Sequence, residues 1–131
     1  MSHRVVVVGG GFGGLRVVQG LRGADVEITL IDRRNFHLFQ PLTYQVATGA
    51  LSPGEIAYPL RALFNHRSDV RVLEANVEAI DAEHRTVRLQ TVDDIEPPVI
   101  EYDTLVVAAG SAYSYFGHEE WREIAAEVKS L

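Results

Sequence analysis

The chain has 131 residues, about the length of one domain, and 12 basic against 18 acidic side chains give it a net charge of −6. An acidic chain with no clustered basic face is a poor match for a polyanion, so we expect no nucleic-acid partner. The absence of cysteine excludes disulfides, thiolate metal sites, cysteine nucleophiles and dithiol redox chemistry within these residues. A single lysine, Lys129, argues against a lysine-containing phosphate loop or a Schiff base.

The first third of the chain predicts a βαβ unit. Residues 4–8 are β-branched and apolar on both faces, as a central parallel strand requires. After a cluster of glycines, apolar residues recur at helical spacing, and Gly23 is a suitable end for that helix. Residues 26–31 predict a second strand, which ends at Asp32.

The middle of the chain is less regular. The segment 33–68 contains three prolines, and we expect one short helix within it, near 54–65. A long excursion of this kind usually carries function. Residues 70–75 predict a third parallel strand, and residues 78–80 and 86–92 predict a small antiparallel excursion.

The last predicted strand covers 100–108, and an amphipathic helix is expected over 121–128, where apolar residues recur at i, i+3, i+4 and i+7. Together these elements predict an α/β domain with a parallel sheet.

A glycine-rich turn joins the first strand to the first helix. Gly9, Gly11 and Gly14 match G-x-G-x-x-G, a weak pattern alone, but here a strand precedes it, a helix follows it and an acid ends the next strand. The first glycine permits the turn, the second lets a pyrophosphate approach the backbone, and the third lets helix pack on strand. The N–H groups of the first helical turn would then hold phosphate without a lysine. A tight turn without a ligand is the alternative.

The other candidate binding residues follow the second and the last strand. Asp32 stands near the spacing at which a carboxylate accepts hydrogen bonds from ribose hydroxyls, although a solvated turn residue is the alternative. Arg33 and Arg34 suggest a nucleotide 2′-phosphate, which Asp32 would repel, so a solvated edge fits them equally well. Small residues at 108–110 allow close approach to a nucleotide, or they end a plain buried strand.

In these motifs the chain resembles the type II NADH:quinone oxidoreductases, which are single-subunit, non-proton-pumping flavoproteins with two dinucleotide-binding domains. The resemblance covers 5–131 and rests on three stretches: GGGFGG, LIDRRNFHLFQPLTYQVATGALSPGEIAYPLR (30–61) and EYDTLVVAAGSAYSYFGHEEW (101–121). The second stretch is far more specific than the glycine turn. The resemblance implies a Rossmann-like three-layer FAD-binding domain with a parallel sheet and a small antiparallel excursion, incomplete relative to the family.

The resemblance also implies which residues contact the adenosine diphosphate part of FAD. The glycine-rich turn would contact the pyrophosphate, through Gly9, Gly11, Phe12, Gly13 and Gly14. Asp32, with Arg33 beside it, would contact the adenosine ribose, and the backbone of Val77 would hold the adenine ring.

Two further segments would approach FAD in similar proteins. Ala109 and Gly110 stand where the family has Ala-Thr-Gly, so a threonine hydroxyl is missing here. The stretch that runs towards the isoalloxazine ring contains Gln40, Pro41, Leu42, Tyr44 and Gln45. Core packing is the alternative for its apolar members, Phe36, Leu38, Phe39 and Leu42.

The implied reaction needs no catalytic residue from the protein: NADH passes a hydride to the flavin N5, and the reduced flavin passes two electrons to a quinone. The five scattered histidines predict no metal site. The lack of cysteine argues against disulfide reductases and sulfide:quinone reductases.

The resemblance implies parts that these residues do not contain: the NADH domain, a return segment that completes the FAD domain and a C-terminal membrane region. We therefore expect 1–131 to be an N-terminal portion of the FAD-binding domain, one strand short of a five-stranded parallel sheet, with an exposed apolar edge. Alone, it is expected to bind FAD weakly or not at all and not to oxidise NADH.

The longest apolar runs are too short to span a bilayer, so we expect a cytoplasmic chain. For the whole protein, the resemblance implies NADH and quinone as partners and a peripheral position on the cytoplasmic face of the inner membrane, and it is compatible with a homodimer. Two alternatives stay open. One is another FAD-dependent pyridine-nucleotide oxidoreductase, such as a ferredoxin or rubredoxin reductase, against which residues 36–49 argue. The other is a non-catalytic dinucleotide-binding module.

Overall fold

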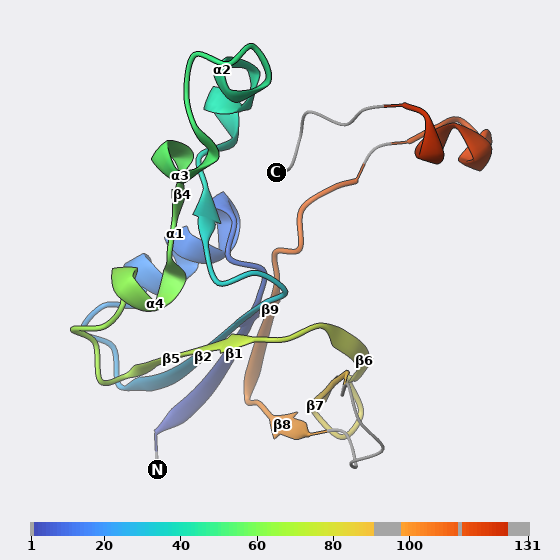
Figure 1. Cartoon of the computed structure of the whole chain (residues 1–131). Coiled ribbons are helices and arrows are strands. Elements are labelled where there is room, and N and C mark those ends of the chain that lie inside the picture. The colour runs from blue at the N-terminus through green and yellow to red at the C-terminus, as the bar shows by residue number, and fades with distance from the viewer. Residues whose placement is uncertain (1, 91–97, 113, 126–131) are drawn as a thin grey trace.

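A parallel sheet of four strands forms the centre of the computed structural model, which describes residues 2–90, 98–112 and 114–125 (Figure 1). The strands lie in the order β5–β2–β1–β9. Their bounds are β1 (His3–Val8), β2 (Val26–Asp32), β5 (Val70–Glu74) and β9 (Thr104–Val107). The βαβ unit and the third strand predicted from the sequence are thus confirmed.

The run of valines in β1 is explained by a separate core on each face of the sheet. On one face, α1 (Phe12–Gly20) and α4 (Leu60–Leu63) cover a core made of Val5, Val7, Val18, Ile28, Leu30, Leu60 and Phe64. On the other face lies a core made of Val6, Ile31, Val87, Leu89 and Tyr102. Burying one such aliphatic side chain stabilises the fold by about 1.5–3 kcal/mol.

A three-stranded antiparallel sheet covers that second core. It consists of β6 (Val77–Asp81), β7 (Thr86–Leu89) and β8 (Val99–Glu101), in that order. Helices, parallel sheet and antiparallel sheet therefore form three layers, which confirms the predicted α/β class and its antiparallel excursion. β7 is shorter than predicted, and residues 91 and 92 of that predicted strand lie outside the described residues.

The first helix begins earlier than the hydrophobic periodicity indicates. α1 starts at Phe12, within the glycine cluster, with Gly11 as its N-cap, and it ends at Gly20. The expected stop, Gly23, lies in the turn that follows, with φ +85°. Glycines at the start of a helix carry no apolar signal, so the pattern of side chains could not mark this boundary.

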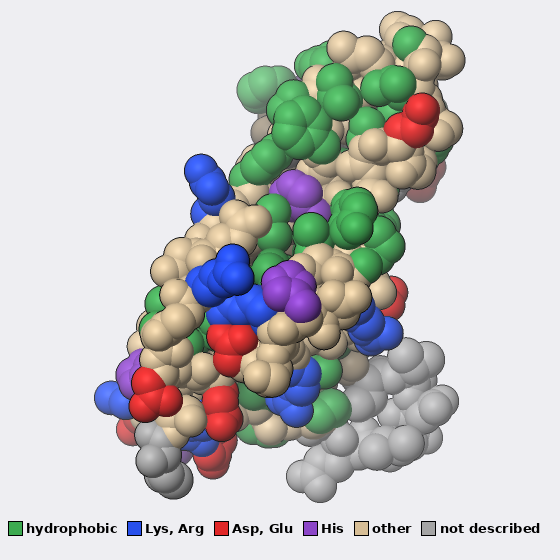
Figure 2. Space-filling view, turned by 90° about the vertical axis from the view of Figure 1, so that its left-hand side faces the viewer, with side chains coloured by type: hydrophobic (Ala, Val, Ile, Leu, Met, Phe, Trp, Pro, Cys, Tyr) green, Lys and Arg blue, Asp and Glu red, His purple; other side chains and the backbone are tan. Residues whose placement is uncertain are grey.

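Residues 36–58 form an arm that projects from the sheet (Figure 1). Its elements are β3 (His37–Leu38), the 3-10 turn η1 (Gln40–Leu42), α2 (Thr43–Ala47), α3 (Pro53–Ile56) and β4 (Ala57–Tyr58). Figure 2 shows hydrophobic side chains gathered on this projecting part, where Tyr44 is 70% and Tyr58 is 56% exposed.

The single short helix predicted near 54–65 is wrong. Two helices of one turn each, α3 and α4, flank β4, which pairs antiparallel with β3. The first helix is held by the N–H of Ser52, which donates to Glu55 Oε2 at 2.6 Å. Pro59, the N-cap of α4, separates the two helices because proline disfavours helical backbone in the residue before it.

The single strand predicted over 100–108 is also wrong, because the chain changes sheets at Tyr102 and Asp103. β8 pairs with β7 in the antiparallel sheet, whereas β9 pairs with β1 in the parallel sheet. Tyr102 is buried between the two sheets, in the second core. The apolar pattern runs through both strands, so it does not show the change of partner.

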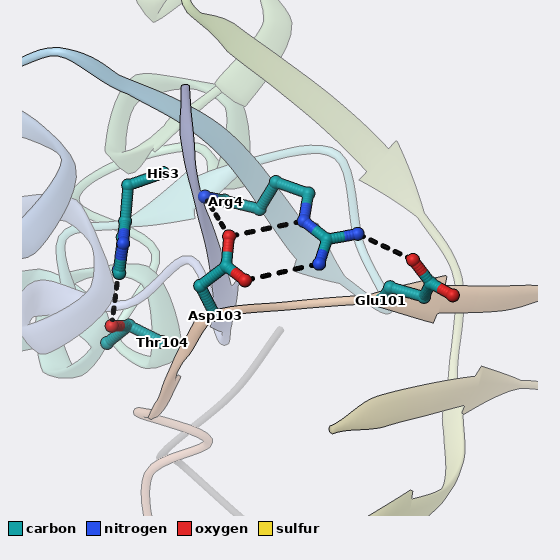
Figure 3. Close-up of polar contacts among 5 residues, drawn as sticks. All are labelled: His3, Arg4, Glu101, Asp103 and Thr104. Atoms are coloured by element: carbon teal, nitrogen blue, oxygen red, sulfur yellow. Dashed lines mark hydrogen bonds and ion pairs between the residues drawn. The ribbon is translucent and has the colours of Figure 1, made fainter. Parts of the chain in front are cut away.

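Arg4 fixes the place where the chain changes sheets (Figure 3). Asp103 Oδ2 accepts hydrogen bonds from the Arg4 backbone N–H at 2.8 Å and from its Nε at 3.2 Å, and Asp103 Oδ1 lies 3.1 Å from Nη2. These bonds raise the pKa of Arg4 and lower the pKa of Asp103 to about 2. Glu101 Oε2 also pairs with Arg4, at 2.6 Å from Nη1.

The amphipathic helix predicted over 121–128 is not formed in the part that the structure describes, residues 121–125. There the chain forms the 3-10 turn η2 (Glu119–Glu123), and residues 126–128 lie outside the described residues.

At the edge of the parallel sheet, β9 leaves Val107 62% exposed. In the described ranges, no helix has the length and apolar character needed to cross a membrane.

Candidate functional site

A cavity of about 450 Å³ lies at the carboxyl ends of β1, β2 and β9. Three turns line it, at 9–13, 32–34 and 108–112, together with Phe36, Leu38 and Gln40 from the arm. In open parallel α/β sheets, ligands bind at this edge, where the loops that follow the strands meet. The volume is within the range of about 300–1,000 Å³ of small-molecule sites.

Two glycines are required by the fold itself. Gly9 has φ +108°, and a Cβ built on it would strike the backbone carbonyl of Ala108. A Cβ on Gly14, which is buried in α1, would strike the carbonyl oxygen of Gly9. The turn from β1 into α1 therefore needs glycine at both positions, whether or not a ligand is bound.

Gly11 differs, because the fold does not require a glycine there. Its backbone is extended, with φ −76° and ψ −162°, and a Cβ built on it meets no atom within 4 Å. Gly11 lines the cavity and is the N-cap of α1, with no side-chain capping hydrogen bond. The N–H groups of the first turn of α1 and the positive end of its dipole are therefore not covered by a capping side chain.

Asp32 binds the glycine-rich turn directly. Its Oδ2 accepts the N–H of Gly10 at 2.6 Å, and its Oδ1 accepts the N–H of Arg34 at 2.8 Å. The N–H of Gly9 donates to the carbonyl of Ile31 at 2.8 Å, so the ends of β1 and β2 are tied together twice. A carboxylate has about four acceptor positions, so Asp32 keeps the capacity to accept hydroxyl donors as well.

Charges of both signs line the cavity. Arg33 and Arg34 lie beside Asp32 on its wall, and the Arg34 guanidinium is 5.8 Å from the centroid of the Phe36 ring. Two cations and one acid near open backbone N–H groups suit a ligand that carries both anionic groups and hydroxyls.

Sequence reasoning missed His37, which it treated as one of several scattered histidines. This residue is buried in β3, and its Nδ1 donates to the carbonyl of Gly10 at 3.0 Å. Its ring is nearly perpendicular to the Phe12 ring, with 5.0 Å between the centroids, and the Phe12 and Phe39 centroids lie 5.7 Å apart. The position of His37 inside the specific FHLFQPL stretch was the available signal.

Most of the predicted binding residues line this cavity: Gly9, Gly11, Phe12, Gly13, Asp32, Arg33, Gln40, Ala109 and Gly110. The others do not: Gly14, Pro41, Leu42, Tyr44, Gln45 and Val77. Gly14 packs α1 against Gly9, Pro41 and Leu42 lie in η1, Tyr44 and Gln45 lie in α2, and Val77 begins β6 beside the second core. The cavity is also lined by Arg34, Phe36, Leu38 and Ala108, for which the sequence left an alternative to ligand binding open, and by Gly10, Ser111 and Ala112, which were not predicted. Across the described ranges, no group of three or more His, Asp or Glu side chains is placed to hold a metal ion.

The fold and this cavity define the class of protein. The family described as pyridine nucleotide-disulphide oxidoreductase matches residues 3–128, and the chain belongs to that family. Two type II NADH:quinone oxidoreductases of Mycobacterium tuberculosis, NdhA and Ndh, are 48% and 47% identical to it, over 129 and 130 residues. Each match covers 98% of this chain, which spans 27% of the length of either relative. The resemblance to type II NADH:quinone oxidoreductases predicted from the sequence is confirmed.

Solved structures share the fold across several oxidoreductases. NDH2 of Plasmodium falciparum superposes with a TM-score of 0.88 over 99% of this chain and 26% of its own, at 20% identity. The sulfide:quinone oxidoreductase of Aquifex aeolicus superposes with a TM-score of 0.78 over 91% of this chain and 27% of its own, at 33% identity. The fold alone therefore does not separate quinone reductases with different electron donors.

Proposed function

We propose that this chain is the FAD-binding portion of a flavoprotein that takes a hydride from NADH and passes electrons to a membrane quinone. The observation that carries the proposal is the cavity at the carboxyl ends of β1, β2 and β9, with Gly11 open to it and Asp32 on its wall. The identity of 47–48% to two type II NADH:quinone oxidoreductases supports the choice of reaction.

The residues present fit the diphosphate of FAD. A side chain at Gly11 would extend into the space beside the first turn of α1, where the protein itself places no atom within 4 Å of that Cβ. Backbone N–H groups at a helix N-terminus bind phosphate without a lysine, and the arginines of the wall supply positive charge. Bound there, FAD would supply the redox chemistry, namely hydride acceptance from NADH and two-electron reduction of a quinone.

We assign the pyrophosphate to the turn at Gly9, Gly11, Phe12, Gly13 and Gly14, where Gly14 acts by letting the turn close. Asp32, with Arg33 beside it, would accept hydrogen bonds from the adenosine ribose. The backbone of Val77 would hold the adenine, and Gln40 and Pro41 would face the isoalloxazine side. Ala109 and Gly110 would let the cofactor pass close to the backbone. The cavity lining supports these roles for all of these residues except Gly14, Pro41 and Val77, whose assignment rests on the family resemblance.

The two alternative functions are another FAD-dependent pyridine-nucleotide oxidoreductase and a non-catalytic dinucleotide-binding module, and different observations bear on each. The NADH:rubredoxin oxidoreductase of Clostridium acetobutylicum superposes with a TM-score of 0.71 at 19% identity, so the fold is compatible with another acceptor. The much higher identity to the quinone reductases favours the quinone. A non-catalytic dinucleotide-binding module would use the same turn, and it differs in taking up NAD while staying colourless.

We further propose that the NADH-binding unit and the membrane contact belong to sequence outside residues 1–131. These residues contain one glycine-rich βαβ unit, and the relatives are nearly four times as long. On this proposal, the 131 residues alone do not oxidise NADH and hold FAD weakly. The whole protein would act at the cytoplasmic face of the inner membrane, as a monomer or a homodimer.

Two preparations test the function: the 131-residue chain and the protein expressed from the complete reading frame. We expect the second to purify with a flavin absorbance band, to oxidise NADH and to reduce a soluble quinone, and the first to show no turnover. Turnover by the 131 residues alone would refute the proposal that NADH oxidation needs sequence outside them. A colourless full-length protein that binds NAD would favour the non-catalytic module, and flavin reduction with no transfer to quinone would favour another acceptor.

A further inference from the structure

The Gly10 residue of the glycine-rich turn is held on both sides by side chains from other elements. Its N–H donates to Asp32 Oδ2 at 2.6 Å, and its carbonyl accepts from His37 Nδ1 at 3.0 Å. Asp32 ends β2 and His37 begins β3, so both bonds come from outside the turn. The α1 hydrogen-bond ladder begins one residue later, with the Leu15 N–H on the Gly11 carbonyl at 2.9 Å, so the Gly10 carbonyl depends on a side chain for its hydrogen bond.

The bond to His37 fixes the direction of a neighbouring donor. The Gly10 carbonyl and the Gly11 N–H belong to one peptide plane, and in a trans peptide these two groups point in opposite directions. No cis peptide bond occurs in the described part of the chain. Holding the carbonyl on the buried His37 ring therefore turns the Gly11 N–H away from that ring. Gly11 is also the residue whose Cβ position is open beside the cavity.

We propose that His37 is a positioning residue that holds the Gly10–Gly11 peptide so that the Gly11 N–H is directed at the diphosphate of the bound dinucleotide. This inference rests on the proposed function and deepens it, because it names what orients the turn before the ligand arrives. A donor that is fixed in advance needs no rearrangement on binding, so it contributes more to affinity than a mobile one.

Packing alone would not need a histidine at this position. The ring of His37 is nearly perpendicular to that of Phe12, and a phenylalanine ring could make the same apolar contact. A carbonyl oxygen only accepts, so Nδ1 carries the proton in this bond. The hydrogen bond and the ring contact can therefore be separated by substitution.

Two variants make that separation. His37→Phe keeps an aromatic ring against Phe12 and removes the donor to Gly10. His37→Asn places a side-chain amide N–H near the position of Nδ1 and removes most of the ring. If FAD affinity depends on the orientation of the peptide, His37→Asn should have an affinity closer to the native value than His37→Phe. If FAD affinity depends on packing, His37→Phe should be the closer of the two.

The test measures the equilibrium affinity of the full-length protein for FAD and for riboflavin, which lacks the diphosphate. We expect His37→Phe to weaken FAD binding about tenfold, or about 1.4 kcal/mol, with riboflavin binding unchanged. His37→Asn is expected to stay within about twofold of the native FAD affinity. The proposal is overturned if His37→Phe binds FAD as the native protein does, or if both variants lose affinity equally.

A second measurement separates this proposal from the proposed function. Hydrogen exchange of the peptide containing Gly10 and Gly11 is followed by mass spectrometry in the ligand-free protein. We expect faster exchange in His37→Phe and native exchange in His37→Asn. If the native protein binds no FAD, the proposed function fails, and the exchange result alone decides whether His37 holds the turn. Equal exchange in all three proteins would show that it does not.

Discussion

The strands β1 and β9 are joined at both ends, by opposite means. At their amino end, charged side chains make the link: Asp103 accepts three hydrogen bonds from Arg4, one of them from its backbone N–H. Just beyond their carboxyl ends, the residues are glycine and alanine. Backbone lies against backbone, with Gly9 so close to Ala108 that no Cβ fits between them.

This difference separates an end of the strand pair that charged side chains hold together from an end where backbone lines the cavity. Ion pairs at the amino end mark where the chain changes sheets. Small residues at the carboxyl end permit a cavity against bare backbone, where N–H groups are the available donors. The two ends should therefore respond differently to substitution, pH and ligand.

The largest expected effect is at Gly14. Gly14→Ala should lower the free energy of unfolding by about 3 kcal/mol, because the added methyl strikes the carbonyl of Gly9 and α1 must move. Urea denaturation measures this. The matched control is Gly20→Ala at the end of α1, where a Cβ meets nothing and the fold should gain about 0.5–1 kcal/mol. A loss equal to that of Gly14→Ala in the control would contradict the steric explanation.

The next effect separates binding from folding at the same end of the sheet. Gly11→Ala should leave the free energy of unfolding within about 0.5 kcal/mol of the native value, because its Cβ enters open space. FAD affinity of the full-length protein should fall about tenfold or more, since the methyl occupies the approach to the first turn of α1. Titration of flavin fluorescence checks this. Unchanged affinity would place the diphosphate elsewhere.

The sequence predicted the elements whose signal is local. The run of valines in β1, the glycine turn and the acid that ends β2 are recognised within about thirty residues, and the structure brings the turn and the acid to one cavity. The exchange of sheets at Tyr102 and Asp103 was not predictable in this way. At that point Asp103 pairs with Arg4, nearly a hundred residues away, while the apolar pattern continues unbroken.

The arm is a second region whose structure the local sequence does not predict. β3 and β4 are two residues long and exist because they pair with each other, so neither carries a periodicity of its own. His37 illustrates the consequence for the site, since its partner is a backbone carbonyl. The FHLFQPL stretch marks His37 as a residue of interest, but it does not show that the ring binds the backbone carbonyl of Gly10.

At the amino end of the strand pair, the pH dependence of stability should reveal Asp103. Its pKa is lowered to about 2 by the hydrogen bonds from the Arg4 side chain and backbone. A carboxyl group with a lower pKa in the folded state stabilises the fold above its unfolded pKa of about 4, and this contribution is lost as the pH falls towards 2. Asp103→Asn should therefore have a lower Tm than the native protein at pH 7, with the difference shrinking between about pH 4 and pH 2.

Thermal unfolding at a series of pH values measures that difference. Asp69 and Asp81 also have lowered pKa values, owing to Arg67 and His84 respectively, but they are present in both proteins and cancel in the comparison. A constant difference in Tm across the acid range would show that Asp103 acts through shape and not through charge.

The smallest effect is expected from the second acid on the same arginine. Glu101→Gln should leave the Tm unchanged within error, although Glu101 Oε2 lies only 2.6 Å from Arg4 Nη1. The Glu101 side chain is 69% exposed and the Arg4 side chain 44%, and exposed pairs are screened by water and salt. Asp103 is 31% exposed and also accepts the backbone N–H of Arg4, a bond that Glu101 does not make. Equal losses in Glu101→Gln and Asp103→Asn would mean that net charge at Arg4, and not the backbone bond, holds β1 to β9.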